Sequence, residues 1–327
     1  MWPRPLPVFG IAALAGLLIG GSFAVALDKF DVRLRDPSDA RTSAEAPLLG
    51  QLPASPSDAL SLAERGQCVL LNPTDPCATS YRVLRRRLEN VLPSGSDKTV
   101  LIASPAESRG TSVLASNLAI STARSGKRVV LVDARQSLRA INEIFGIEDR
   151  VGLSDVIAGK LKVTAALHVT GLDGLEVLPA GSAEEDWSEL LNQPGFYQAL
   201  TDLSEQFDRV IIDGGGARSD ECRIISAFCD VTVVFADARK NNRVDLRAAV
   251  EGLRAVGANI IGVVLKGPAR QPSSAELGME LGQIRGFWSR AATNGNGERL
   301  KDKEIGGVRA EATGQHAPDE PEGLKII

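Results

Sequence analysis

The chain has 327 residues, of which 43% are apolar, 24% charged and 4% aromatic, and its formal net charge is −4. These proportions are typical of a globular protein and not of a disordered one. The negative net charge argues against a nucleic-acid-binding surface, and the few aromatic residues argue against a platform on which bases stack.

Histidine and cysteine are too sparse for several common kinds of site. The two histidines, His168 and His316, do not favour a His-based catalytic triad or a zinc centre. The four cysteines match no CxxC spacing. Cys222 and Cys229 lie in an apolar stretch, so we expect them to be buried thiols, in keeping with a reducing cytosol.

The amino-terminal region contains an apolar segment, residues 8–27, that carries no charged side chain. A helix of this length can cross the hydrocarbon core of a bilayer. One basic residue precedes the segment and several follow it, namely Arg4, then Lys29, Arg33 and Arg35. This bias places the carboxyl-terminal side in the cytoplasm. A cleaved signal peptide ending near Ala24-Val25-Ala26 is the alternative, but the longer apolar run favours a transmembrane anchor over residues 1–27.

Residues 28–97 have a mixed composition that predicts a juxtamembrane linker followed by a basic helix. Residues 79–92 read TSYRVLRRRLENVL, with apolar side chains at helical spacing and a basic face. The basic side chains are Arg82, Arg85, Arg86 and Arg87. They form either a solvated helix face or a contact with anionic lipid or with a second copy of the chain.

Residues 98–288 alternate between short apolar runs and helical patterns. The runs predict strands at 99–103, 128–132, 175–178, 210–212, 231–235 and 260–265, and helices at 111–124, 187–191, 195–206 and 244–256. This alternation predicts an α/β fold, a parallel sheet with helices on both faces and a ligand crevice at the carboxyl ends of the strands. Residues 289–327 are polar and rich in glycine, which predicts a disordered tail.

The segment SPAESRGTS, residues 104–112, connects the first of these strands to its helix. A P-loop occupies this place in nucleotide-binding folds, where backbone amides and a helix N-terminus hold phosphates. In register with GxxxxGK[ST], Gly110 is the second glycine, Thr111 takes the lysine position and Ser112 the hydroxyl, while Pro105 replaces the first glycine. The other reading is an ordinary strand-to-helix turn with an N-cap hydroxyl.

Two further strands, VVLVD and VIID, end in the acids Asp133 and Asp213. Both acids should emerge at the same edge of the sheet as the loop, where they resemble Mg²⁺-side carboxylates. A single aspartate in this place is often only a turn former. If the site binds ATP or ADP with Mg²⁺, the nucleotide contacts would come from Ser104, Arg109, Gly110, Thr111 and Ser112. Ser112, Asp133 and Asp213 would serve the metal, and the two acids would be the catalytic candidates.

An ordered series of short motifs over residues 3–268 carries a family resemblance. The motifs are WPRPLP, DKFDVRLRDPSD, LLGQLP, SYRVLRRRL, the loop, SNLA, the strand ending at Asp133, GLSDVIAG, LEVLPAG, SELL and FDRVIID. In this order they resemble the bacterial tyrosine kinases of capsular and exopolysaccharide assembly, with their polysaccharide co-polymerase membrane region. The resemblance implies a P-loop NTPase-like fold, a place in the bacterial inner membrane and partners in polysaccharide polymerisation and export.

The chain departs from the family pattern at several positions that carry chemistry. Thr111 stands in place of the P-loop lysine, and Arg135 in place of the second acid of the D-x-D motif. Glycines follow Asp213 where the family has threonine and proline, and Lys266 stands where an asparagine is common. The carboxyl-terminal tyrosine cluster of the family is missing, since the only tyrosines are Tyr81 and Tyr197.

Other departures bear on assembly. The oligomerising E-x-x-R-x-x-R motif of the family begins here with Thr79, although Arg82 and Arg85 remain and could still support a homo-oligomer. The family's first membrane helix and large periplasmic region have no counterpart in the sequence. The resemblance therefore implies either a separate periplasmic co-polymerase chain as partner or a truncated relative.

Loss of the lysine bears directly on phosphoryl transfer, which depends on positive charge at the β/γ oxygens. Removing a principal electrostatic contact costs about 10²–10³ in rate. Arg109 lies at a different backbone position, and Arg135 offsets some of the lost charge without handling a metal. We expect weak or no nucleotide binding and a membrane-tethered regulatory or assembly subunit of exopolysaccharide export. The alternative is an active tyrosine autokinase or ATPase with a divergent P-loop, and a remote one is a membrane-associated partitioning ATPase.

Overall fold

The computed structural model describes residues 14, 16–18, 20–22, 32–34, 36–54, 60–92, 98–148, 151–182 and 186–267. All of them belong to one compact unit, residues 1–284. Among these described residues, no helix combines the length and the apolar character needed to cross a bilayer. Most of the expected span, residues 8–27, and all of the expected tail, residues 289–327, lie outside the described residues.

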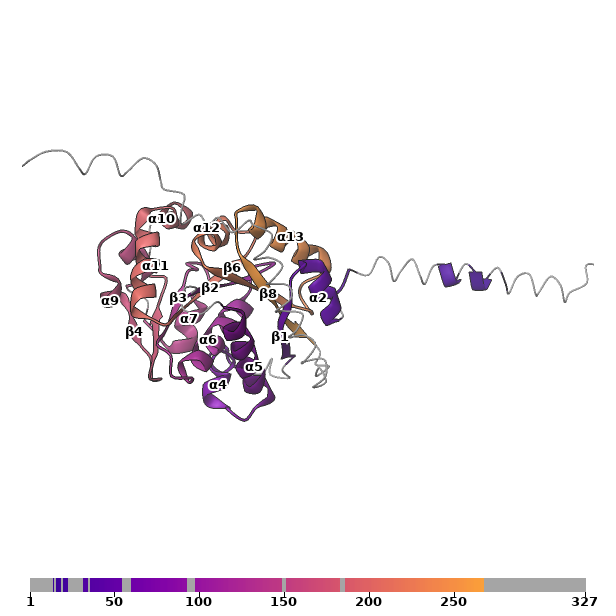
Figure 1. Cartoon of the computed structure of the whole chain (residues 1–327), viewed down its shortest axis with the longest axis horizontal. Coiled ribbons are helices and arrows are strands. Elements are labelled where there is room, and N and C mark those ends of the chain that lie inside the picture. Colours follow the sequence, from indigo (N-terminus) through magenta and orange to yellow (C-terminus); the bar gives the residue numbers. More distant parts are fainter. Residues whose placement is uncertain are drawn as a thin grey trace, which may run out of the picture. The chain divides into compact units, whose positions relative to one another are not determined.

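A mostly parallel sheet forms the centre of the described domain, in the order β1-β8-β7-β2-β6-β3-β5-β4 (Figure 1). The strands are β1 Leu48–Pro53, β2 Thr99–Ser104, β3 Val129–Asp133, β4 His168–Val169, β5 Leu175–Leu178, β6 Arg209–Gly216, β7 Val231–Asp237 and β8 Ile260–Gly267. Only the short edge strand β4 runs antiparallel to its neighbour. β2, β3, β6 and β7 are buried along their whole length, which explains their continuous apolar runs.

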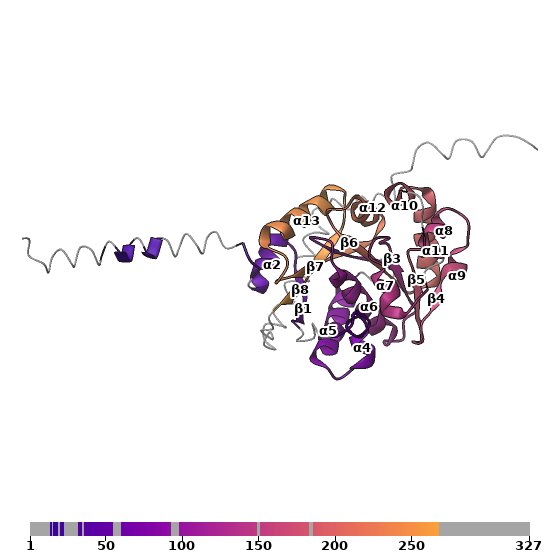
Figure 2. The same cartoon turned by 180° about the vertical axis from the view of Figure 1, so that it is seen from behind.

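Helices cover both faces of this sheet, as Figures 1 and 2 show from opposite sides. The layer that contains α6 is α3 Leu62–Gly66, α4 Cys68–Leu71, α5 Pro76–Val91, α6 Arg109–Ala123 and α7 Ala140–Phe145. The other layer is α2 Pro37–Ala44, α8 Leu153–Ile157, α9 Val163–Ala166, α10 Trp187–Leu191, α11 Pro194–Gln206, α12 Asp220–Phe228 and α13 Arg243–Ala255. Alternate side chains of the central strands point to opposite faces of the sheet. Leu101 of β2, for example, belongs to the same core cluster as Phe196 and Leu203 of α11.

The predicted α/β class and parallel sheet are confirmed, and each of the six predicted strands is present. The predicted helices correspond to α6, α10, α11 and α13, and the basic helix to α5. The sheet also extends into the region expected to be a linker, because β1 pairs in parallel with β8. Residues 36–54 and 60–92 therefore pack with the α/β domain as part of one fold.

Candidate functional site

The predicted loop lies between β2 and α6, as the sequence indicates, and we call residues 104–112 the cradle. Ser108 is the N-cap of α6, and its side-chain oxygen accepts a hydrogen bond from the Gly110 amide at 3.0 Å. Ser104 closes the start of the loop by donating its hydroxyl to the Ala106 carbonyl at 2.6 Å. An amide that a P-loop offers to phosphate is thus already bonded to the chain's own side chain.

The two strand-ending acids lie side by side at this edge of the sheet. Asp133 and Asp213 are register partners of the paired strands β3 and β6, and both are buried. The Ser112 hydroxyl donates to Asp213 Oδ2 at 2.5 Å. Asp133 Oδ1 accepts the backbone amide of Arg135 at 3.0 Å. Serine and acids therefore meet as expected, because parallel strands end at a common edge.

The side chain of Arg135 fills the cradle from the end of β3. Its guanidinium donates to the Ser108 carbonyl at 2.8 Å, the Thr111 hydroxyl at 3.2 Å and the Ser112 hydroxyl at 2.8 Å. The side chain is only 4% exposed. A cation from within the chain therefore binds the residues at which the P-loop lysine and the metal-binding hydroxyl are expected.

Two carboxylates neutralise this guanidinium. Arg135 Nη1 donates to Glu107 Oε1 at 2.9 Å, and Arg135 Nε lies 3.4 Å from Asp213 Oδ2. Glu107 also accepts the Gly216 amide at 3.0 Å, which joins the loop to the end of β6. The network Glu107–Arg135–Asp213 thus connects three segments of the site. A buried pair of this kind is held by mutual compensation, and loss of one partner leaves an unneutralised charge.

The glycines after Asp213 allow this close packing. A Cβ atom on Gly215 would lie 2.4 Å from Arg135 Cδ, and one on Gly216 would lie 2.9 Å from the Glu107 backbone nitrogen. Gly215 also has a φ of +72°, a conformation that favours glycine. Glycines at these positions therefore leave room for the Arg135 side chain, which larger residues would not.

As they stand, these residues do not fit a magnesium nucleotide. The Arg135 guanidinium is already paired with the carboxylates of Glu107 and Asp213. The Ser112 oxygen, which a P-loop needs as a metal ligand, accepts a hydrogen bond from the Arg135 guanidinium at 2.8 Å. The Arg135 side chain occupies the space in which a phosphate would meet the loop.

Arg109 lies within the cradle, but its side chain does not join the cluster around Arg135. Its guanidinium turns to α7 and pairs with Glu143 at 2.8 Å, with both side chains about half exposed. Of the two acids that contact the Arg135 guanidinium, Asp213 was predicted from the sequence and Glu107 was not. Glu107 could have been noticed in the sequence, because a carboxylate inside a loop of P-loop length would repel phosphate.

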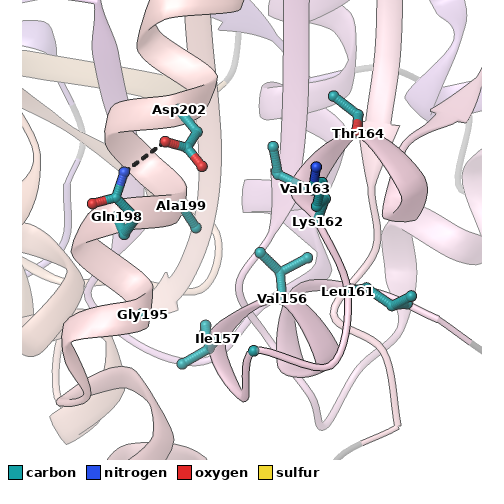
Figure 3. Close-up of a pocket in the computed structure, with 11 residues that line it drawn as sticks. Val156, Ile157, Leu161, Lys162, Val163, Thr164, Gly195, Gln198, Ala199 and Asp202 are labelled. Carbon is teal, nitrogen blue, oxygen red and sulfur yellow. Dashed lines mark hydrogen bonds between the residues drawn. The ribbon is translucent and has the colours of Figure 1, made fainter. Parts of the chain in front are cut away.

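A separate cavity of about 450 Å³ lies between α8, α9 and α11 (Figure 3). Its walls are mostly apolar, with Val156, Ile157 and Val163 facing α11 across the gap. Gln198 and Asp202, one turn apart on α11, are joined by a hydrogen bond of 2.7 Å. None of the cradle residues lines this cavity, which is therefore distinct from the predicted site.

The predicted state of Cys222 and Cys229 is confirmed, since both are free and buried. Burial raises the pKa of the Cys222 thiol to about 12 and that of Cys229 well above its ordinary value. A second pair of free thiols is Cys68 on α4 and Cys77 on α5. Interaction with the Cys68 thiol lowers the pKa of Cys77, and interaction with Cys77 raises the pKa of Cys68.

We expect iodoacetamide to alkylate Cys77 first in the native protein. Its lowered pKa means that the thiolate, which is the nucleophile, forms at lower pH than in an ordinary cysteine. Cys77 is also half-buried, whereas the other three cysteines are buried. Peptide mass spectrometry across a pH series measures the order of labelling. Alkylation of Cys222 as fast as Cys77 before unfolding would contradict the assignment.

The sequence is similar to one family model and to several bacterial tyrosine kinases. The family model described as "Cellulose biosynthesis protein BcsQ" matches residues 107–256. The tyrosine-protein kinase ptk of Acinetobacter johnsonii is 25% identical over 270 residues, which cover 80% of this chain and 37% of ptk. The tyrosine-protein kinase YwqD of Bacillus subtilis is 25% identical over 208 residues, which cover 63% of this chain and 88% of YwqD.

The fold is also similar to solved structures of bacterial tyrosine kinase domains. The BceF tyrosine kinase domain is 25% identical with a TM-score of 0.65, and the match covers 72% of this chain and 100% of that domain. The kinase domain of Escherichia coli ETK has the same fold, with a TM-score of 0.67 at 21% identity over 73% of this chain and 97% of that domain. The resemblance is confirmed: the relatives of this chain are bacterial tyrosine kinases. The chain spans only 37% of the length of ptk, so it corresponds to part of that protein.

Proposed function

We propose that this chain is a membrane-tethered, kinase-like subunit of exopolysaccharide polymerisation and export. It acts in assembly or regulation, with little or no ATP-dependent activity. Its relatives among bacterial tyrosine kinases and the match to a cellulose biosynthesis family support the setting. The substitutions in the cradle support the loss of catalysis.

One observation carries this proposal: the buried guanidinium of Arg135 occupies the cradle. It contacts Thr111, which stands at the lysine position of a P-loop, and Ser112, which stands at the position of the metal-binding hydroxyl. Phosphate binding would require displacement of this cation from two carboxylates. Without a lysine to replace it, the displaced arrangement lacks the charge that phosphoryl transfer needs.

Membrane location and partners belong to the same proposal. The apolar segment at residues 8–27 would hold the chain in the bacterial inner membrane, with the α/β domain in the cytoplasm. The polysaccharide polymerase and exporter, and a separate periplasmic co-polymerase chain, are the partners that fit a subunit of this kind. A homo-oligomer through α5 would use Arg82, which is exposed, more readily than Arg85, which pairs with Glu89 at 3.0 Å.

An active ATPase or tyrosine autokinase is the second candidate, and one contact favours it. The 2.5 Å bond between Ser112 and Asp213 keeps a hydroxyl and a carboxylate together at the strand ends, as a metal site would need. For this function the Arg135 side chain must leave the cradle. Self-labelling would have to fall on Tyr197, because Tyr81 is only 3% exposed.

Polymer output in a deletion strain that carries Ser112→Ala distinguishes the two candidates. We expect output close to that of the wild type, because Ser112 only bonds neighbouring side chains in the proposed function. Under the alternative, loss of the metal-binding hydroxyl would reduce turnover by about 10² or more, and output would fall toward that of the deletion. Ser116→Ala, one turn further along α6, is the matched control, and protein amounts are compared by immunoblot.

A further inference from the structure

The point at which the amino-terminal segment joins the domain is fixed by hydrogen bonds. Arg33 forms an antiparallel bridge with Asn242, just before α13. The Arg243 amide donates to the Val32 carbonyl at 2.7 Å, and the Arg243 side chain donates to the Arg33 carbonyl at 3.1 Å and pairs with Asp39 at 2.7 Å. Residues 32–34 are therefore anchored to the first turn of α13.

This attachment limits how far the domain can lie from the bilayer, given the membrane anchor of the proposed function. Four residues lie between Leu27, the end of the apolar segment, and Val32, so five Cα-to-Cα steps join them. A fully extended chain spans at most about 3.6 Å per residue, or roughly 18 Å in all. The first turn of α13 must then lie within about two Debye lengths of the headgroups at physiological ionic strength.

The surface around this attachment is basic. Its exposed cations are Arg33, Arg239, Lys240 and Arg247, which we call the α13 basic surface. Three of the nearby acids are paired, Asp39 with Arg243, Asp245 with Arg218 and Asp237 with Lys266. Asp36 and Glu251 are exposed.

Exposed apolar side chains lie among these cations. Val32 is 44% exposed and Val244 is 60% exposed, on the two segments that the hydrogen bonds join. Cations beside exposed apolar side chains suit the interface of a bilayer, where headgroups meet acyl chains. An acidic protein partner would explain the charge but not the enforced proximity to the membrane.

We propose that the α13 basic surface docks onto anionic phospholipid headgroups. β7 and β2 run parallel, so the start of α13, which follows β7, and the cradle, which follows β2, lie at the same carboxyl edge of the sheet. Docking through the start of α13 therefore turns this edge toward the bilayer. The domain is thus held in one orientation beneath the membrane, with the closed cradle near the lipid surface.

Hydrogen–deuterium exchange on the full chain in lipid nanodiscs tests this docking. Discs of phosphatidylcholine alone are compared with discs that also contain phosphatidylglycerol. We expect amides of residues 238–247 to gain protection only in the anionic discs and to lose it in high salt. Each basic residue near an anionic leaflet contributes about a five-fold factor, so loss of Lys240 and Arg247 lowers the docked-to-free ratio by about 25-fold or more.

Lys240→Glu with Arg247→Glu is the test variant, and Lys160→Glu with Lys162→Glu carries the same charge change as its control. The control lysines are exposed and lie between α8 and α9, before the edge strand β4 at the far end of the sheet. Loss of protection in the test variant alone supports docking. Equal protection in both kinds of disc overturns it and leaves an acidic protein as the partner for this surface. Failure of the chain to enter discs of either kind refutes the anchor itself, and with it the premise of docking.

Discussion

Replacing Arg135 with alanine is expected to lower the free energy of unfolding by about 3–5 kcal/mol. The side chain is 4% exposed, and its removal leaves Asp213 buried without its cation. The same change removes hydrogen bonds to the Thr111 and Ser112 hydroxyls. Chemical denaturation of the purified protein, followed by circular dichroism, measures the loss.

Arg109→Ala is the matched control for this prediction. Arg109 lies on the adjoining helix turn and also pairs with a carboxylate, but both partners are about half exposed. Exposed ion pairs contribute about 1 kcal/mol or less, because water screens them. A larger loss of stability for Arg109→Ala than for Arg135→Ala would contradict the view that Arg135 holds the cradle together.

Restoring the family's charges is expected to strengthen nucleotide binding relative to the natural chain. In the pair Thr111→Lys and Arg135→Asp, a lysine replaces the hydroxyl and a second acid replaces the cation. Recovery of a principal phosphate contact should strengthen ATP binding by about 10²-fold or more. Binding of a fluorescent ATP analogue with Mg²⁺ measures the gain.

The single change Thr111→Lys tests whether adding the lysine is sufficient while Arg135 still occupies the cradle. The Thr111 hydroxyl lies 3.2 Å from the Arg135 guanidinium, so a lysine there sets two cations against each other. We expect the single variant to be less stable than the natural chain, with a coupling of about 1–3 kcal/mol when Arg135→Asp is added. If Thr111→Lys alone bound ATP as well as the double variant, Arg135 would not be the element that closes the site.

Most of the sheet could be predicted because its central strands are buried on both faces and therefore appear as apolar runs. β1 escaped prediction because LLGQLP is short and contains glycine and proline, a composition that also suits a linker. Its pairing with β8 is a contact between residues about two hundred positions apart, which no local pattern reports. β6 runs on through Gly214–Gly216, where a strand pattern is invisible because no side chains alternate.

The place of the site was predictable, but its internal contacts were not. Strand ends and a loop of the right length located Ser112, Asp133 and Asp213 at one edge. The sequence also suggested that Arg135 compensates for the missing lysine, although not that its side chain enters the loop. Whether Arg135 or Arg109 does so depends on side-chain direction: one leaves the end of β3 toward the cradle, and the other points from α6 to Glu143.

Isothermal titration of the purified full-length chain with ATP and Mg²⁺ tests the central claim most directly. With the Arg135 guanidinium bonded within the cradle, the account predicts no measurable binding at micromolar concentrations of nucleotide. Micromolar affinity for ATP that disappears in Asp213→Ala would show instead that the guanidinium yields its place to phosphate and that the cradle is a working nucleotide site.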